Sequence, residues 1–156
     1  MFHFVIETSD RWERVTSSPI CYGAIHDSYA TFQVKRSGKI KAIKLQHVSG
    51  SLTCKGVNPE DMSYWSCISN PKESATGITN NEDTPIFPAS FGTGSLLEIE
   101  DHQIPEIILR TGDLQTPYYD AVKGEILKVW YYEDFIKGSD HDNSGTHCVN
   151  VNALYC

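Results

Sequence analysis

The chain has 156 residues, of which 40% are apolar and 21% are charged, and its formal net charge is −7. This composition is typical of a globular domain that buries a core, and it disfavours a disordered chain. The negative charge disfavours nucleic acid and anionic membrane surfaces as partners, and no apolar run approaches the length of a membrane span. We therefore expect a single domain over residues 1–156 that neither binds nucleic acid nor inserts into a membrane.

Short segments rich in β-branched and aromatic residues recur along the chain, separated by turn signals such as Ser49-Gly50. In chain order they are Phe2–Glu7, Tyr29–Val34, Lys39–His47, Leu52–Cys54, Leu96–Ile99, Glu106–Arg110, Glu125–Tyr132 and Cys148–Leu154. No window shows a clear helical period with caps. The segment Cys67–Thr93 is rich in Asn, Ser, Thr, Pro and Gly and predicts a long surface loop. Short strands at near-regular spacing predict an all-β fold, an antiparallel sandwich or barrel, and we favour the antiparallel β-sandwich.

The strand Glu125–Tyr132 can be given two faces, because successive side chains of a strand alternate. Lys128 favours solvent and therefore marks the less buried face. That face holds Ile126, Lys128, Trp130 and Tyr132, and the core face holds Leu127, Val129 and Tyr131. Trp130 and Tyr132 are thus expected toward solvent; the alternative is that Trp130 forms an edge of the core.

The segment Glu133–Gly145 (EDFIKGSDHDNSG) concentrates oxygen ligands on a bending backbone. Its thirteen residues include four carboxylates, from Glu133, Asp134, Asp140 and Asp142, together with the amide of Asn143 and the hydroxyl of Ser144. Calcium binds such hard oxygen donors. The sequence therefore predicts a Ca²⁺ site at Asp134, Asp140, Asp142 and Asn143, with Glu133 as a neighbouring alternative ligand.

Residues 140–145 match the first half of an EF-hand loop, with donors at positions 1, 3 and 5 and glycine at position 6. The twelfth position is Val151 rather than a bidentate glutamate, and the predicted flanks are strands, so this is not an EF-hand. Two other interpretations stay open, a solvated acidic turn and a calcium ion that serves only the structure.

Sequence motifs of common enzyme classes are absent, including GxSxG, HExxH, the P-loop and GxGxxG. His147 and Cys148 are adjacent, and neighbouring residues of a strand point to opposite faces, so His147 is poorly placed to activate Cys148. A carboxylate pair that hydrolyses glycosides remains an alternative. Acids crowded into one loop are more typical of metal ligands, and we expect a protein that is not an enzyme.

The five cysteines form no CxxC pair, and the histidines are scattered, which disfavours a zinc site. Two internal disulfides and one spare thiol would suit a secreted protein; the alternative is a reduced cytosolic protein with incidental thiols. The sequence does not determine the connectivity. We expect Cys54–Cys67, which closes a short loop, and Cys21–Cys148, leaving Cys156 at the chain end to link a partner chain.

Aromatic residues are abundant in or beside the predicted loops, namely Tyr22, Tyr64, Trp65, Tyr118, Tyr119, Trp130 and Tyr132. Each of them taken singly can be explained by core or loop packing. The apolar face of a galactose ring also packs on such rings, while its hydroxyls form hydrogen bonds or coordinate a metal.

Two strings near the C-terminus, Trp130–Asp134 (WYYED) and Asp142–Val149 (DNSGTHCV), together with Ile40–Cys67, carry a resemblance. They resemble a domain of secreted cnidarian proteins, and within it the calcium-dependent galactose-binding lectins of sea anemones. The resemblance implies a disulfide-linked homodimer of β-rich subunits that binds galactose-containing glycans outside the cell. The EPN and QPD triplets of C-type lectins and the repeated QxW of ricin-like lectins are absent.

The leading hypothesis is therefore a secreted lectin in which loop-bound Ca²⁺ takes two vicinal hydroxyls of galactose. Tyr132, or Trp130 on the same strand face, would form the aromatic wall, with His141 as a hydrogen-bonding neighbour and Cys156 as the intermolecular disulfide. An extracellular matrix or adhesion module with a purely structural calcium is the second hypothesis, and a hydrolase with a carboxylate pair is the third.

Overall fold

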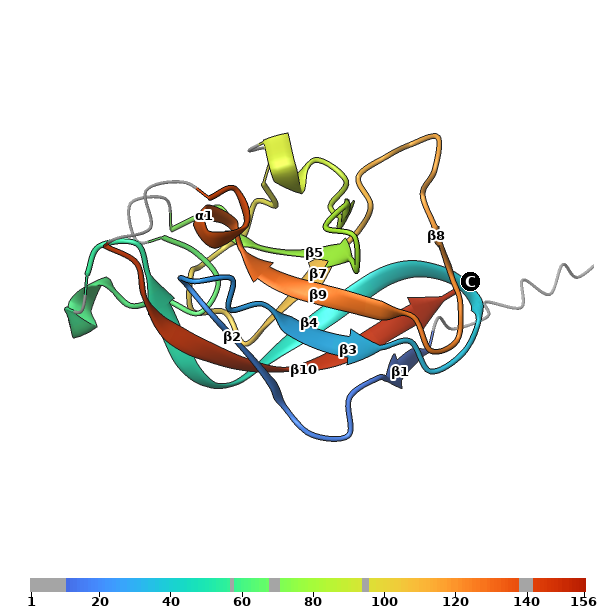
Figure 1. Cartoon of the computed structure of the whole chain (residues 1–156), viewed down its shortest axis with the longest axis horizontal. Helices are drawn as coiled ribbons and strands as arrows, with labels where there is room; N and C mark the ends of the chain where they lie inside the picture. Colours follow the sequence, from blue (N-terminus) through green and yellow to red (C-terminus); the bar gives the residue numbers. More distant parts are fainter. Residues whose placement is uncertain (1–10, 57, 68–70, 94–95, 138–141) are drawn as a thin grey trace, which may run out of the picture.

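Two antiparallel sheets packed against each other make up the fold of the computed structural model (Figure 1). The structure describes residues 11–156 except 57, 68–70, 94–95 and 138–141. The expected strand Phe2–Glu7 lies outside the described residues. The prediction of an all-β antiparallel sandwich is confirmed.

Among the described residues the larger sheet has six strands, in the order β1-β10-β4-β7, with β2 paired to β10 and β8 paired to β4. These strands are β1 (Trp12–Arg14), β2 (Ile20–Gly23), β4 (Gly38–Thr53), β7 (Glu106–Leu109), β8 (Tyr119–Ala121) and β10 (Ser144–Tyr155). The smaller sheet, in the order β3-β9-β5-β6, consists of β3 (Ala30–Gln33), β9 (Ile126–Tyr131), β5 (Thr76–Asn80) and β6 (Pro85–Phe87).

Helical structure in the described part of the chain is limited to three short segments. They are the 3-10 helices η1 (Pro59–Asp61) and η2 (Phe91–Thr93) and the four-residue helix α1 (Tyr132–Phe135), which follows β9 directly. No helix there is long and apolar enough to cross a membrane.

The two longest strands, β4 and β10, run side by side over most of their length (Figure 1). The expected turn at Ser49-Gly50 was wrong, because β4 continues through it. The carbonyl of Thr146 lies where a Cβ of Gly50 would be, and the φ of Gly50 is +76°. Gly50 is therefore needed because the two strands approach closely at this point. A register shift beside it leaves Val48 as a β-bulge without a partner in the ladder.

The predicted surface loop Cys67–Thr93 contains two strands, β5 and β6, and this prediction is corrected. All residues of β5 except Asn80 are buried, although the strand is rich in threonine and glycine. Gly77 is required because the ring of Phe91 occupies the space of its Cβ. The side chain of Asn80 then accepts hydrogen bonds from the amides of Glu82 and Thr84, which turns the chain into β6.

The core lies between the two sheets. The larger sheet contributes alternate residues of β10, and the smaller sheet contributes alternate residues of β9; they are Val149, Val151, Ala153, Leu127, Val129 and Tyr131. The predicted core face of β9 is thus confirmed.

Both predicted disulfides are present. Cys21 and Cys148 are direct partners in the β2–β10 ladder, with their Cα atoms 4.0 Å apart, and Cys54 pairs with Cys67. Cys156 is exposed and forms no disulfide within the chain. The thiol is therefore available for a bond to another chain.

Candidate metal and sugar site

The acidic segment begins where β9 passes into α1 and ends where β10 begins. At the first end α1 carries Glu133 and Asp134, and at the second end Asp142 and Asn143 precede β10. Asp140 lies outside the described residues. The structure thus allows four of the five predicted metal ligands to be located.

Glu133 and Asp142 come together around the phenol of Tyr131. Burial raises the pKa of Tyr131, and the negative charges of Glu133 and then of Asp142 raise it further. The Tyr131 hydroxyl and the Glu133 oxygen Oε2 are both buried. Two carboxylates from opposite ends of the segment therefore both act on the phenol of Tyr131.

Asn143 supplies the most informative atom of this group. Its side chain is 4% exposed, and its Nδ2 donates to the carbonyl of Ala24 at 3.1 Å. Its Oδ1 has no hydrogen-bond partner among the described residues. A buried acceptor without a partner costs about 1–3 kcal/mol, so this oxygen is a candidate to accept a hydrogen bond or to coordinate a cation.

Oxygen ligands of this kind fit calcium. Among the described residues no group of three or more His, Cys, Asp or Glu could hold a metal. Besides Asp134, the predicted oxygen ligands that the structure describes are the carboxylates of Glu133 and Asp142 and the amide carbonyl of Asn143. Such a mixed oxygen set suits Ca²⁺ and offers no nitrogen or sulfur ligand to a softer metal.

Asp134 has a structural task that sequence reasoning missed. It is buried, and its Oδ1 and Oδ2 accept hydrogen bonds from the backbone amides of Asp27 and Ser28, each at 2.9 Å. The loop that it holds contains positive φ angles at His26 (61°) and Asp27 (56°). Asp134 therefore anchors the loop between β2 and β3, and its role as a metal ligand stays a prediction.

The start of β10 is fixed from the other side by Gly56. The amide of Gly56 donates to the carbonyl of Asp142, and the Ser144 hydroxyl donates to the carbonyl of Gly56 at 2.6 Å. Gly145 has a φ of +100°, and a Cβ there would overlap the carbonyl of Ser51. The C-terminal end of the acidic segment is therefore held in place by β4 and the loop after it.

The expectation that Trp130 lies toward solvent was wrong. Its side chain is on the predicted face of β9, yet it is only 2% exposed. Its Nε1 donates to Thr79 Oγ1 at 3.0 Å, and its ring contacts the rings of Tyr29 (4.7 Å between centroids) and Phe135 (5.3 Å). Residues from α1 and from the start of β3 cover this face, which a strand pattern alone does not reveal.

The other predicted sugar-binding residues have different surroundings. Tyr132 is half-buried, and its ring packs edge-on against Phe91, with 5.6 Å between centroids. His141 lies outside the described residues. Trp65, another of the aromatic residues expected in or beside loops, is fully buried.

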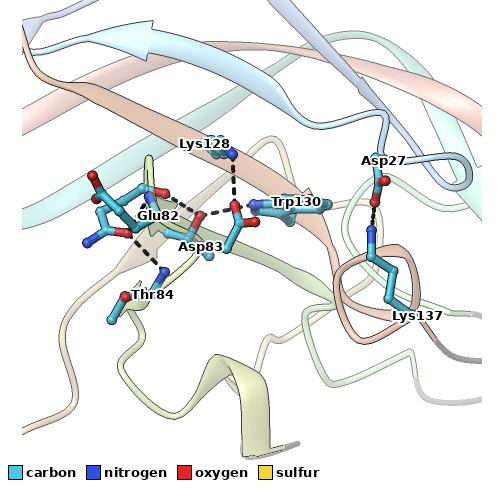
Figure 2. Close-up of polar contacts among 9 residues, drawn as sticks. Asp27, Glu82, Asp83, Thr84, Lys128, Trp130 and Lys137 are labelled. Atoms are coloured by element: carbon cyan, nitrogen blue, oxygen red, sulfur yellow. Dashed lines mark hydrogen bonds and ion pairs between the residues drawn. The ribbon is translucent and has the colours of Figure 1, made fainter.

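Lys128 is also buried, at 8% exposure, although it was assigned to solvent. Figure 2 shows its Nζ directed at Asp83, with 2.8 Å to Oδ1, and Lys137 directed at Asp27. Lys128 Nζ also lies 4.3 Å from the ring centroid of Tyr29, and Lys137 Nζ lies 5.7 Å from that of Trp130. Each lysine near these aromatic rings is therefore paired with an aspartate.

A second polar cluster lies inside the sandwich, around His147. Its Nδ1 is 2.9 Å from the hydroxyl of Tyr22, and its Nε2 is 2.8 Å from Nδ1 of His47. His47 is stacked on Tyr64, with ring centroids 3.6 Å apart. Burial, helped by the nearby His47, lowers the pKa of His147 to about 3. Burial also lowers the pKa of His47.

The fold is shared with a lectin of known structure. AJLec, a lectin from the sea anemone Anthopleura japonica, superposes with a TM-score of 0.80 over 94% of this chain and 98% of AJLec. The sequences are 23% identical. Neither a protein-family model nor a curated protein matches the sequence. The resemblance to sea-anemone lectins is thus confirmed at the level of the fold.

The His147 cluster predicts how stability depends on pH. The folded state holds the pKa of His147 at about 3, whereas an unfolded histidine titrates near 6.5. Between these values the unfolded state binds the extra proton, so the free energy of unfolding falls as the pH drops from about 6.5 toward 3. In His147→Gln this fall should be shallower, and stability at pH 7 should be lower because Tyr22 and His47 lose their shared partner.

Denaturant unfolding at a series of pH values measures both effects. His26→Asn is the matched control, because His26 is exposed and asparagine tolerates its positive φ. A pH dependence in His147→Gln identical to that of the wild type would contradict the assignment.

Proposed function

We propose that this protein is a secreted lectin that binds galactose-containing glycans with the help of Ca²⁺, and that it is not an enzyme. The observation that carries the proposal is the buried Oδ1 of Asn143, which has no partner among the described residues and lies in a fold shared with a sea-anemone lectin. The two disulfides support secretion, because such bonds persist in oxidising compartments.

In this proposal Glu133, Asp142 and Asn143 hold the calcium, with Asp140 and Asp134 as the other predicted ligands. The hydrogen bond from Asn143 Nδ2 to Ala24 fixes the amide, so that Oδ1 is presented in one orientation. A calcium ion bound there would offer coordination positions to two neighbouring sugar hydroxyls. The hydroxyls at carbons 3 and 4 of galactose form a cis pair, which glucose lacks.

The sugar face of the site is proposed to include Tyr132 and His141, as the sequence suggested. Because Trp130 is buried, we propose that it supports the aromatic rings that contact it, those of Tyr29 and Phe135, and does not itself bind the sugar. Two copies of the site in a dimer joined through Cys156 would cross-link glycans by avidity.

Calcium should stabilise the protein, because a ligand that binds only the native state raises the free energy of unfolding, by about 2.7 kcal/mol when its free concentration is 100 times Kd. Asp142→Ala and Asn143→Ala should each lose most of this gain. Asp120→Asn is the control, since Asp120 is an exposed acid in β8 whose ion pair with Lys39 is long, at 3.9 Å. Thermal unfolding with calcium and with EDTA measures the effect, and a melting temperature insensitive to EDTA would remove calcium from the proposal.

Galactose binding should require calcium. We expect calorimetry to detect lactose binding in calcium and at least a tenfold loss of affinity in chelator. Cellobiose, which differs from lactose in the orientation of one hydroxyl at carbon 4 of the terminal sugar, should bind at least tenfold more weakly, or about 1.4 kcal/mol.

The two outcomes separate the competing functions. Calcium that raises the melting temperature while no galactoside binds would favour the adhesion module with a structural ion. Lactose affinity that is equal in calcium and in chelator would exclude the metal from sugar recognition.

Cys156 should link two chains. It is exposed, and its amide donates to the carbonyl of Lys39 at 3.0 Å, which holds the last residue against β4. Electrophoresis without reductant should show a dimer for the wild type and a monomer for Cys156→Ser. A covalent dimer that persists in Cys156→Ser would assign the link to another cysteine, and a monomeric wild type would show that the chain forms no such link.

A further inference from the structure

A cavity of about 490 Å³ lies between the loop after β2 and the beginning of β10. Its lining includes Ala24, Ser28, Tyr29, Ser144 and Thr146. The lining thus combines hydroxyls and peptide groups with one aromatic ring. This volume and this mixture of an aromatic ring with several polar groups suit a small ligand such as a hexose.

Tyr29 is the aromatic residue of this cavity, and its side chain is 36% exposed. The ring is supported from within the protein by Trp130, at 4.7 Å between centroids and a tilt of 44°, and by Lys128, whose Nζ lies 4.3 Å from the centroid. A ring held by such contacts loses little conformational freedom when a ligand packs on it. Tyr29 is therefore both accessible and fixed before binding.

The charges near this ring favour a neutral ligand. Lys128 is paired with Asp83, and Lys137 is paired with Asp27, as Figure 2 shows. Neither lysine therefore offers an unpaired positive charge to a ligand carboxylate or sulfate. An uncharged sugar, which presents one apolar face and several hydroxyls, suits the cavity better than an anionic one.

The cavity is joined to the candidate metal ligands through three short connections. Ala24 lines the cavity, and its carbonyl accepts the hydrogen bond from Asn143. Ser144, another lining residue, follows Asn143 directly. Asp134 accepts hydrogen bonds from the amides of Asp27 and Ser28, and so holds the loop that leads into Tyr29. The same residues that shape the acidic site therefore also position Tyr29.

We propose that Tyr29, supported by Trp130, is the aromatic wall on which the neutral galactose unit packs. This inference rests on the proposed lectin function, assigns the stacking role to Tyr29 instead of Tyr132, and adds the preference for an uncharged sugar. Sequence reasoning missed Tyr29 because its position at the start of a strand gave no sign that Trp130 would support it.

The test is lactose calorimetry in calcium on four variants. Tyr29→Ala and Tyr29→Leu should weaken binding about tenfold, because both lose the ring, while Tyr29→Phe should stay within about twofold of the wild type. Tyr118→Ala is the matched control: Tyr118 is an exposed tyrosine that lines a different cavity. Its affinity should not change.

The rise in melting temperature with calcium provides a readout that is independent of the sugar, and it should be retained in all four variants. If Tyr29→Ala loses this rise, the loop has collapsed in that variant. The lactose affinity of Tyr29→Leu, which keeps most of the side-chain volume, then tests whether the ring binds the sugar.

Lactose affinity in Tyr29→Leu or Tyr29→Ala equal to that of the wild type would overturn the inference and leave the lectin function intact. A wild type that binds no galactoside in calcium would overturn the function, and the inference with it. The preference for a neutral sugar is tested by lactose that carries a sulfate on carbon 6 of its galactose; tighter binding than unmodified lactose would contradict it.

Discussion

The long pairing of β4 with β10 forms the centre of the larger sheet and fixes the positions of its other strands. β10 also pairs with β1 and β2, and the Cys21–Cys148 disulfide locks it to β2. Gly50 and Gly145 allow the two long strands to continue where any side chain would collide with the facing carbonyl. The pairing therefore sets where β10 starts, and the start of β10 presents Asn143 and Ser144 to the candidate site.

A second constraint comes from the cost of burying polar groups. Three buried polar side chains have partners that offset this cost. Asp134 accepts hydrogen bonds from two backbone amides, and Lys128 forms an ion pair with Asp83. His147 forms hydrogen bonds with Tyr22 and His47. Asn143 differs, since only its Nδ2 is satisfied within the described residues. The contrast matters more than the count of acids in the segment, because it marks one particular buried oxygen as a candidate ligand.

Sequence reasoning succeeded where a single local rule decides the outcome. Alternation in β9 placed Leu127, Val129 and Tyr131 in the core, and both disulfide pairings were correct. It failed where the neighbour comes from a distant part of the chain. Trp130 was assigned to solvent because the strand pattern does not include Phe135 and Tyr29, which cover it.

The same limitation explains why β5 was not predicted, since its composition is typical of a loop. Its burial depends on the partner strand β9 and on Phe91, whose ring fills the place of a side chain at Gly77. The acidic segment was recognised from composition alone, yet the structural role of Asp134 required knowing that the loop at Asp27 and Ser28 lies beside it.

The proposed site binds the sugar through two kinds of interaction, metal coordination and apolar contact, which are lost under different conditions. Oxygen ligands such as Asn143 bind through charge and coordination, so their contribution vanishes with the metal. The ring of Tyr29 contributes through apolar contact, which needs no ion but does need the loop to be in place. Because Asp134 and Asn143 both bond to that loop, through Ser28 and Ala24, the two contributions are coupled through the backbone. A site on loops can thus differ between proteins that share this fold at 23% identity, since the scaffold fixes where the loops begin while the side chains decide what they bind.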